Sequence, residues 1–402
     1  MNYRVLAAAV LALAAMTARA DVIDDWTDAT DAIATDQRLP PPLYARVLAL
    51  LHVSMFEAVN AIDRRYASYA LDLVADRKTS REAAIAAAGH DVLAAEFPDQ
   101  VRALDARLAK SLEAVEAGPA RDRGLLLGRR AAADLRARRL PDGSELSETY
   151  RPVTAPGVYV PTASVAGSTV GQFKPWVMAS ASEFRPAPPP ASSSETWTRD
   201  FNEIRLAGAV ASTVRTPNQT DVARFWFLTG PRCWIPLVRQ ALTASTPDLT
   251  DRLRAHALVS MAAADAFIAV FDAKYAYNLW RPVTAIRNAD RTGNSATPRE
   301  AAWLPLGETP MHPEYPCAHC ISAAAVAGVL RGLRGDQLPE LALTSATAPG
   351  VTRRFTRLTD YEDEVSNARV WAGFHYRFST EVARDMGHRI AERTLATQLR
   401  RR

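Results

Sequence analysis

The sequence predicts an all-α protein built from helical bundles. Ala-rich segments with apolar residues at helical spacing recur along most of the chain. The alternation typical of a strand is not found over a convincing length. The chain of 402 residues, 48% of them hydrophobic, is long enough to bury a large core. These observations favour bundles packed side by side.

The first twenty residues are typical of a cleavable secretory signal. Arg4 precedes an apolar run from Val5 to Ala15, and Ala18-Arg19-Ala20 stands before Asp21. The apolar run is shorter than the roughly 20 residues that a membrane span needs. We therefore expect residues 1–20 to be removed and residues 21–402 to form an exported protein, periplasmic or extracellular, without a membrane span. An uncleaved membrane anchor is the alternative.

Helical pattern covers both halves of the mature chain. In the first half it spans residues 43–63, 82–95, 100–117 and 122–139. In the second half it spans residues 197–216, 219–229, 233–244, 248–280, 320–333, 358–371 and 379–398. Residues 140–198 between them are rich in proline, which resists regular helix. A connection of this length is often functional, and we expect it to lie over a cleft within a single domain.

The charge of the chain excludes nucleic acid as an expected partner. The formal net charge is +4, and it is +2 without Arg4 and Arg19. The basic cluster of residues 129–139 contains Asp134 and lacks interleaved aromatic residues, so it is interpreted as a solvated helix face. We expect small molecules as partners, and the sequence does not indicate an oligomeric state.

Two cations stand seven residues apart in the run Lys274-Tyr-Ala-Tyr-Asn-Leu-Trp-Arg281-Pro282. Lysine is rare in this chain, with four in a Lys+Arg total of 48. Seven residues make about two helical turns, so both heads are expected on one face of a helix. From one face they can converge on a small oxyanion.

A second group of candidate residues is His312-Pro-Glu-Tyr-Pro316-Cys317-Ala318-His319-Cys320, followed by a helix-forming segment. Pro316 before a helix leaves the next backbone N–H groups free, and the helix dipole adds positive charge there. The sequence therefore predicts an anion-binding helix end that carries a histidine.

The third group is Arg369-Val-Trp-Ala-Gly-Phe-His375. Positions six apart lie about 120° from one another on a helix, so a break is needed to bring both heads together. Gly373 is a suitable place for that break.

These groups together suit a tetrahedral or trigonal-bipyramidal oxyanion. Lys274, Arg281 and Arg369 can neutralise its oxygens, and guanidinium groups bind such oxygens in bidentate geometry. Of two histidines, one can bond the central atom and the other can handle a proton.

The three groups, in this order, resemble the vanadium-dependent haloperoxidase and acid phosphatase superfamily, which includes the type 2 phosphatidic acid phosphatases. Its motifs are Lys-x6-Arg-Pro, Pro-Ser-Gly-His and Ser-Arg-x5-His-x3-Asp. The likeness is closest to the soluble bacterial haloperoxidase-like branch and extends to Leu51–Ile62, Pro156–Thr162, Thr216–Thr220 and Trp280–Ile286. The resemblance implies two four-helix bundles packed side by side in one domain.

The resemblance also implies a role for each motif residue. His375 would bond vanadium in a haloperoxidase or become the phosphorylated nucleophile in a phosphatase, and His319 would be the acid/base group. The residues implied to hold the oxyanion are Lys274, Arg281, Cys317, Ala318 and Arg369. A haloperoxidase would use vanadate as cofactor and oxidise halide with hydrogen peroxide, whereas a phosphatase would need no metal.

The chain departs from the motifs at four positions. Cys317 and Ala318 replace the Ser and Gly of the second motif, and Ala318 loses backbone freedom if a positive φ is needed there. Ala368 replaces the Ser of the third motif, and Ser379 replaces its Asp, so the last histidine loses a charged partner.

Two acids on the helix before Lys274 are candidates to replace that partner, Asp265 and Asp272. A free Cys317 thiol among cations would be oxidised by peroxide, which favours a phosphatase, and a Cys317–Cys320 disulfide would protect it. Cys233 would then remain as an odd thiol.

Three functions follow from this sequence. A vanadate-dependent haloperoxidase is our first hypothesis, an acid phosphatase acting through a phosphohistidine the second, and a non-catalytic secreted anion-binding protein the third. A zinc site at Cys317, Cys320, His312 and His319 is a further alternative, although no second cysteine pair accompanies it.

Overall fold

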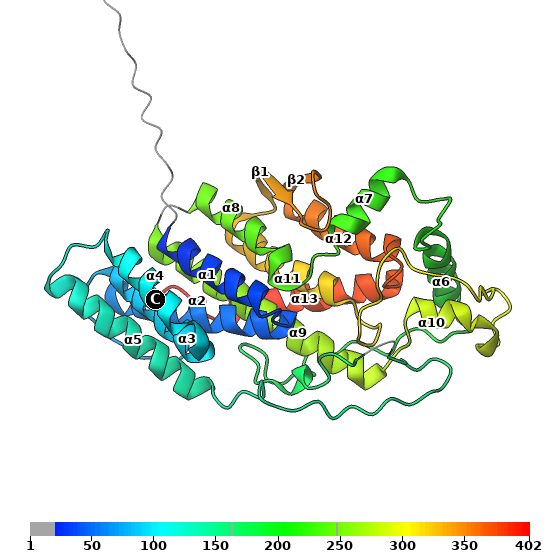
Figure 1. The fold of residues 1–402 in the computed structure, drawn as a ribbon, viewed down its shortest axis with the longest axis horizontal. Helices are drawn as coiled ribbons and strands as arrows, with labels where there is room; N and C mark the ends of the chain where they lie inside the picture. Colours follow the sequence, from blue (N-terminus) through cyan, green and yellow to red (C-terminus); the bar gives the residue numbers. More distant parts are fainter. Residues whose placement is uncertain (1–20, 162–163, 247) are drawn as a thin grey trace, which may run out of the picture.

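A computed structural model describes residues 21–161, 164–246 and 248–402, so the expected signal at 1–20 lies outside the described residues. The described chain contains thirteen α-helices and one two-stranded sheet. The prediction of an all-α, helical-bundle fold is therefore confirmed (Figure 1).

The first group of helices contains α1 (Val22–Asp36), α2 (Pro41–Asp63), α3 (Arg81–Glu96), α4 (Val101–Leu112) and α5 (Pro119–Arg139). In this group, α3, α4 and α5 lie at one end of the molecule, and α1 and α2 extend from there towards its centre (Figure 1). Asp21 and Ser80 begin α1 and α3 by accepting backbone N–H bonds with their side chains. A Cβ on Gly128 of α5 would lie 2.2 Å from the Ala84 carbonyl oxygen of α3, so glycine there permits the close packing of these two helices.

The second group contains the C-terminal helices. It comprises α6 (Glu195–Ala207), α7 (Pro217–Phe225), α8 (Ile235–Ser245), α9 (Leu249–Tyr277), α10 (Pro282–Arg287), α11 (Ala318–Arg334), α12 (Leu358–Trp371) and α13 (Arg377–Thr397). α9, α11, α12 and α13 pack against one another, and α9 also packs against α2 of the first group. Most of these helices were predicted to within a few residues, but α1 and the short α10 were not.

Of the described helices, α2 and α9 are long and apolar enough to cross a membrane. Both are almost entirely covered by other parts of the protein, because they lie at the centre of the two packed groups. Their apolar character is therefore accounted for by burial in the core. His52 of α2 and His256 of α9 meet there, with ring centroids 4.9 Å apart.

A β-hairpin between α11 and α12 corrects the expectation that the chain has no strands. β1 (Gln337–Thr344) pairs antiparallel with β2 (Thr352–Arg357), and Leu341 lies opposite Phe355. The sequence pattern is weak because a single hairpin on the surface needs few buried positions, and proline interrupts β1.

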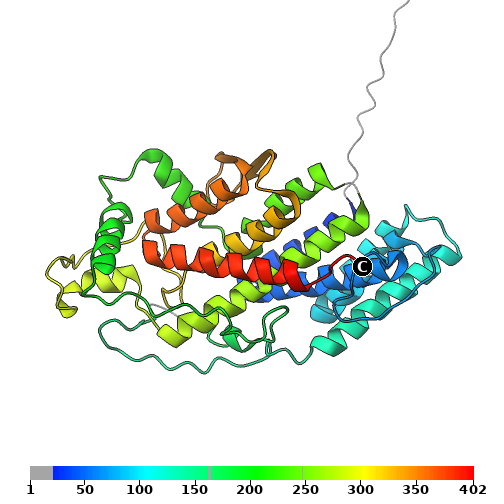
Figure 2. The same ribbon diagram turned by 180° about the vertical axis from the view of Figure 1, so that it is seen from behind.

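The proline-rich connection of residues 140–198 runs along the outside of the helices in both views (Figures 1 and 2). Before α6 begins at Glu195, the only helical element among its described residues is the 3-10 turn η2 (Val170–Gln172). Asp265 of α9 accepts the backbone N–H groups of Trp176, Val177 and Met178 at 2.7 to 2.9 Å. Asp272, about two turns further along α9, forms an ion pair with Arg185 at 2.7 Å. These two acids attach the connection to α9.

The buried histidine pair predicts loss of stability in acid. Burial lowers the pKa of His256 from 6.5 to about 3, with Arg239 and Arg252 adding to the effect. Below pH 6.5, His256 is therefore protonated in the unfolded chain, whereas in the folded chain it stays neutral until about pH 3. The free energy of unfolding falls as the pH drops from 6.5 towards 3 because the unfolded state binds this additional proton. We expect His256→Leu to reduce the loss between pH 7 and pH 4 by about 1 to 3 kcal/mol, measured by urea unfolding.

His90→Gln is the matched control for this prediction. Hydrogen bonds to Asp91, and then to Asp105, raise the pKa of His90, so its protonation stabilises the folded state below pH 6.5. Its replacement should increase acid sensitivity, and an equal response of both variants would contradict the assignment.

Candidate active site

Lys274 and Arg281 reach the same place from different elements. α9 ends at Tyr277, and Asn278 turns the chain with φ 50° while its N–H caps the Lys274 carbonyl. Arg281 then stands as the N-cap of α10. The expectation that both heads project from one face of a continuous helix is therefore wrong, and the turn at Asn278 brings them together instead.

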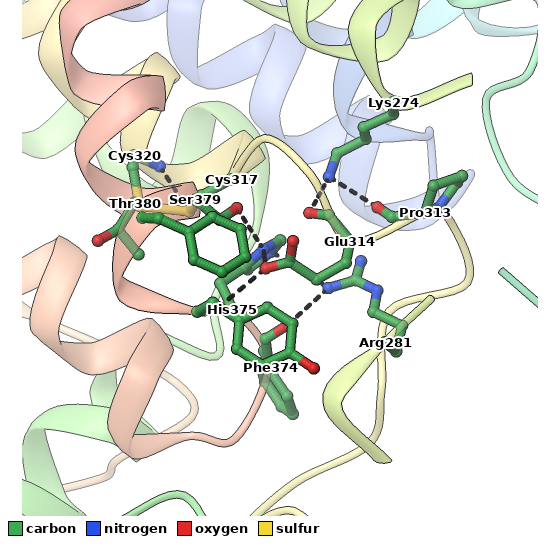
Figure 3. Close-up of polar contacts among 12 residues, drawn as sticks. Lys274, Arg281, Pro313, Glu314, Cys317, Cys320, Phe374, His375, Ser379 and Thr380 are labelled. Atoms are coloured by element: carbon green, nitrogen blue, oxygen red, sulfur yellow. Dashed lines mark hydrogen bonds and ion pairs between the residues drawn. A yellow bond between two sulfur atoms is a disulfide. The ribbon is translucent and has the colours of Figure 1, made fainter. Parts of the chain in front are cut away.

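The Lys274 ammonium is fully buried beside the segment that precedes α11. It donates to the carbonyl oxygens of Pro313 at 2.8 Å and Glu314 at 2.9 Å (Figure 3). Burial, and then the neighbouring charge of Arg281, lower the pKa of Lys274 well below its usual value, although Glu314 opposes this. An ammonium has three N–H donors, so one remains for another acceptor.

Arg281 connects the second and third motifs. Its Nε donates to the His312 carbonyl at 2.8 Å, and its Nη1 donates to the Phe374 carbonyl at 2.9 Å. Nη1 also lies 3.2 Å from Nε2 of His375, and Nη2 lies 2.9 Å from Nδ1 of His312. Burial lowers the pKa of Arg281 to about 10, so it is a cation at neutral pH.

His375 is buried between Arg281 and Glu314 (Figure 3). Its Nδ1 lies 3.0 Å from Oε1 of Glu314, which also accepts the Tyr376 N–H at 3.0 Å. A guanidinium can only donate, so Nε2 of His375 is the acceptor and its proton is on Nδ1. Burial, followed by the charges of Arg281, Lys274 and Arg369, lowers the pKa of His375 well below 6.5. His375 is thus a neutral ring whose Nε2 carries a lone pair.

Glu314 is the carboxylate partner of His375. The expectation that Asp265 or Asp272 supplies this carboxylate is wrong. Asp265 and Asp272 hold the 140–198 connection, as described above, and do not contact His375. Ser379 Oγ is 3.5 Å from Nδ1 of His375, at the limit of a hydrogen bond. Burial raises the pKa of Glu314 to about 7, against the lowering effect of Lys274 and Arg281. The signal in the sequence was an acid inside the second motif group itself, two residues after His312.

Arg369 reaches the site because α12 ends directly after it. α12 stops at Trp371, and Gly373 has φ +81°, which confirms the expected break. The N–H groups of Phe374 and His375 then both donate to the Arg369 carbonyl. Its Nη1 donates to the Trp226 carbonyl at 2.5 Å, whereas its buried Nε has no partner among the described residues.

The start of α11 decides the points left open for Cys317 and Ala318. Cys317 is the N-cap and is joined to Cys320 by a disulfide, so the zinc alternative is wrong because neither sulfur is a thiolate. Ala318 is the first residue of α11 and does not have a positive φ, so alanine costs nothing there. His319 Nε2 donates to the Leu228 carbonyl at 2.9 Å.

A cavity of about 290 Å³ lies beside both motif histidines, His319 and His375. His319, His375 and Ala318 are part of its wall, together with residues of the 140–198 connection. Lys274, Arg281 and Arg369 are not among its described lining residues, but the charges of all three act on both His319 and His375. The three motifs are therefore brought together in one region, and the connection covers it as expected.

The disulfide predicts the number of accessible thiols. Cys233 is the remaining cysteine, and burial raises the pKa of its thiol to about 12. We expect thiol titration of the purified protein in denaturant to give one thiol per chain without reductant and three after reduction. Three thiols before reduction would contradict the disulfide.

Residues 254–401 match the family model of the VCPO second helical-bundle domain. A curated relative, the vanadium chloroperoxidase of Curvularia inaequalis, is 25% identical over 272 residues. That alignment covers 50% of this chain and 43% of the relative, so the chain spans less than half of the relative's length.

Solved structures share the fold. The crystal structure of the first bacterial vanadium-dependent iodoperoxidase has a TM-score of 0.81 at 23% identity, covering 94% of this chain and 96% of that one. A holo-type bacterial vanadium-dependent chloroperoxidase has a TM-score of 0.67 at 16% identity, covering 88% and 91%. With the matched domain and the curated relative, these findings support the resemblance of the motifs: residues 254–401 match the second helical-bundle domain of this family, and the chain shares the fold of bacterial vanadium-dependent haloperoxidases.

Proposed function

We propose that this protein is a vanadate-dependent haloperoxidase that oxidises halide with hydrogen peroxide. The observation that carries the proposal is the buried charge around His375. Lys274, Arg281 and Arg369 are each at most 2% exposed, and Glu314 is the carboxylate buried with them. Buried cations without matching anions are costly, so the site favours a small dianion such as vanadate.

The residues present fit vanadate. The Nε of Arg369 is a buried donor without a partner, and Lys274 keeps one free N–H. The first N–H groups of α11, beginning at Ala318, have no intrahelical acceptor. These groups would hold the oxygens, and Nε2 of His375 would bond the metal. When bound, vanadate supplies Lewis-acid activation of peroxide.

The other residues prepare the protein for this chemistry. Glu314 keeps the proton of His375 on Nδ1, which leaves Nε2 free to bind. His319 lines the same cavity with its Nε2–H fixed on Leu228, so its Nδ1 can accept a proton. Burial, followed by the charge of Arg369, lowers the pKa of His319 well below 6.5, so it begins as a base.

The disulfide favours peroxidase over phosphatase chemistry. A free thiol at Cys317 would be oxidised by peroxide or hypohalous acid, but the sulfur is already joined to Cys320. It also supports our proposal that the protein works outside the cytoplasm, since disulfides persist in oxidising compartments.

An acid phosphatase is the second candidate. Its supporting observation is the neutral His375 with a lone pair on Nε2, which would also suit a nucleophile that takes up a phosphoryl group. The same buried cations would stabilise the transferring group, and no metal would be needed. A protein that binds the anion without catalysis is the third candidate.

Replacing His375 separates these candidates when two assays are run together. We expect the wild type with vanadate, peroxide and iodide or bromide to halogenate a phenolic dye, and His375→Ala to lose this activity and at least 100-fold in vanadate affinity. His90→Gln, on the distant α3, is the control and should keep both. Hydrolysis of an aryl phosphate without halogenation would favour the phosphatase, and inactivity in both assays with vanadate bound would favour the third candidate.

Substitutions that remove the carboxylate beside His375 and then restore one from Ser379 test the role of Glu314. We expect Glu314→Gln to weaken vanadate binding by about 10- to 100-fold, because the acceptor of the His375 Nδ1–H loses its negative charge and no longer raises the basicity of Nε2. Ser379→Asp in the Glu314→Gln background places a carboxylate near Nδ1, which Ser379 Oγ approaches to 3.5 Å. Calorimetric titration with vanadate should show partial recovery in the double variant, and unchanged affinity in Glu314→Gln would refute the role.

A further inference from the structure

The end of the chain is bonded to the segment that follows α2. The backbone N–H of Arg402 donates to the Arg65 carbonyl at 3.1 Å. An isolated antiparallel β-bridge joins Tyr66 to Arg401. These backbone contacts hold the C-terminus, which Figure 2 marks, against the first group of helices. The last side chains are therefore part of a defined surface.

Arginine side chains from four parts of the chain meet at this surface. Nε of Arg254 in α9 donates to the Leu399 carbonyl at 2.7 Å, and its guanidinium lies 4.8 Å from the centre of the Tyr66 ring. Burial lowers the pKa of Arg254, and the charges of Arg401 and Arg334 add to this effect, so these groups lie near one another. We define the C-terminal arginine surface as Arg65, Arg254, Arg334, Arg400, Arg401 and Arg402.

Most of the positive charge on this surface is not neutralised. Asp248 and Asp251 both pair with Arg65, at 2.6 and 2.8 Å. The other five arginines form no ion pair with a carboxylate in the part of the chain that the structure describes. Six arginines, two aspartates and the chain-end carboxylate give the surface a formal charge of +3, whereas the whole chain without Arg4 and Arg19 has +2. The positive charge of the protein is thus gathered here.

The C-terminal arginine surface is open and is not a groove. Arg334 and residues 400–402 are exposed. None of the six arginines is part of the wall of the cavity beside the motif histidines, or of four other cavities in the described chain. A single small anion would gain few contacts on such a surface, whereas a plane of phosphate groups can meet several guanidinium groups at once.

An exposed apolar side chain lies near this surface. Nη2 of Arg64, the residue before Arg65, donates to the Ala75 carbonyl at 2.9 Å. This bond holds the loop that carries Val74, whose side chain is 72% exposed, at the same end of α2. Apolar and basic side chains on one exposed surface are typical of proteins that lie at the boundary between lipid headgroups and acyl chains.

We propose that the C-terminal arginine surface docks the protein on a membrane of anionic phospholipid, by pairing its guanidinium groups with lipid phosphates. The contact is peripheral and needs no membrane span. α13 leads from the site at His375 to this surface over 21 residues, which is about 30 Å of helix, so a docked protein keeps its site away from the lipid. The inference does not depend on the proposed haloperoxidase function.

Co-sedimentation with lipid vesicles tests the docking. We expect the protein to bind vesicles of phosphatidylglycerol at least tenfold more tightly than vesicles of phosphatidylcholine at low salt. The difference should disappear in about 1 M NaCl, where charges are screened beyond about 3 Å. Each arginine near an anionic membrane contributes on the order of a fivefold gain in affinity. Arg400→Gln, Arg401→Gln and Arg402→Gln combined should therefore weaken binding to phosphatidylglycerol at least tenfold.

The matched control removes three exposed arginines from other parts of the surface. Arg151→Gln, Arg224→Gln and Arg291→Gln combined change the net charge by the same amount and should keep the wild-type affinity to within about twofold, because attraction to the lipid falls off within a Debye length. Glutamine preserves the backbone contacts of the chain end, and circular dichroism checks that both triple variants fold. All three proteins have the same N-terminus, so a difference between them reports the substituted arginines alone.

Three results would each overturn the proposal: no binding to phosphatidylglycerol vesicles, equal binding to both kinds of vesicle, or an equal loss of affinity in the two triple variants. Heparin and polyphosphate test the alternative partner, a soluble polyanion. If these polymers bind the wild type and the vesicles do not, membrane docking is refuted. Vanadate and peroxide are absent from every arm, so failure of the proposed haloperoxidase function would leave this result unchanged.

Discussion

Burial of positive charge around one neutral imidazole is the constraint on which the site depends. Lys274, Arg281 and Arg369 are held by carbonyl oxygens from several segments, which bind the cations without neutralising them. Burial therefore opposes protonation of Lys274 and lowers its pKa. In the proposed function an entering oxyanion would reverse this cost, and the site would be complete only with its anion.

The sequence predicted the helical fold and the residues of the three motifs, because helical spacing and short motifs are local. It did not predict how these residues meet. Glu314 and His375 are 61 residues apart, and no periodicity links them. The carboxylate was expected on α9 because Asp265 and Asp272 precede Lys274 there, whereas their partners lie in a connection without regular structure. Contacts made by such segments depend on tertiary packing, which a single sequence does not show.

Two departures from the motifs are explained by neighbouring residues. Ser379 stands where the superfamily motif has Asp, and Glu314 supplies a carboxylate to the same histidine from the segment before α11. Cys317 stands where the motif has Ser, and its sulfur caps α11 while joined to Cys320. In the first case the carboxylate comes from another part of the chain, and in the second the residue at the motif position caps the helix itself, so a motif search alone underestimates how complete the site is.

The 140–198 connection is attached to α9 and contributes to the cavity wall, whereas other parts of the chain supply the charged groups. The cations and histidines come from helices or their ends, whereas Gly167, Val170 and Phe173 of the connection form part of the cavity wall. Asp265 and Asp272 hold this connection on α9 and do not contact His375. In the proposed function, changes in the connection would alter which molecule is accepted while the groups proposed to bind the oxyanion stay in place. The connection would then be an element that sets selectivity and that evolution or protein engineering can vary independently of the residues proposed for the chemistry.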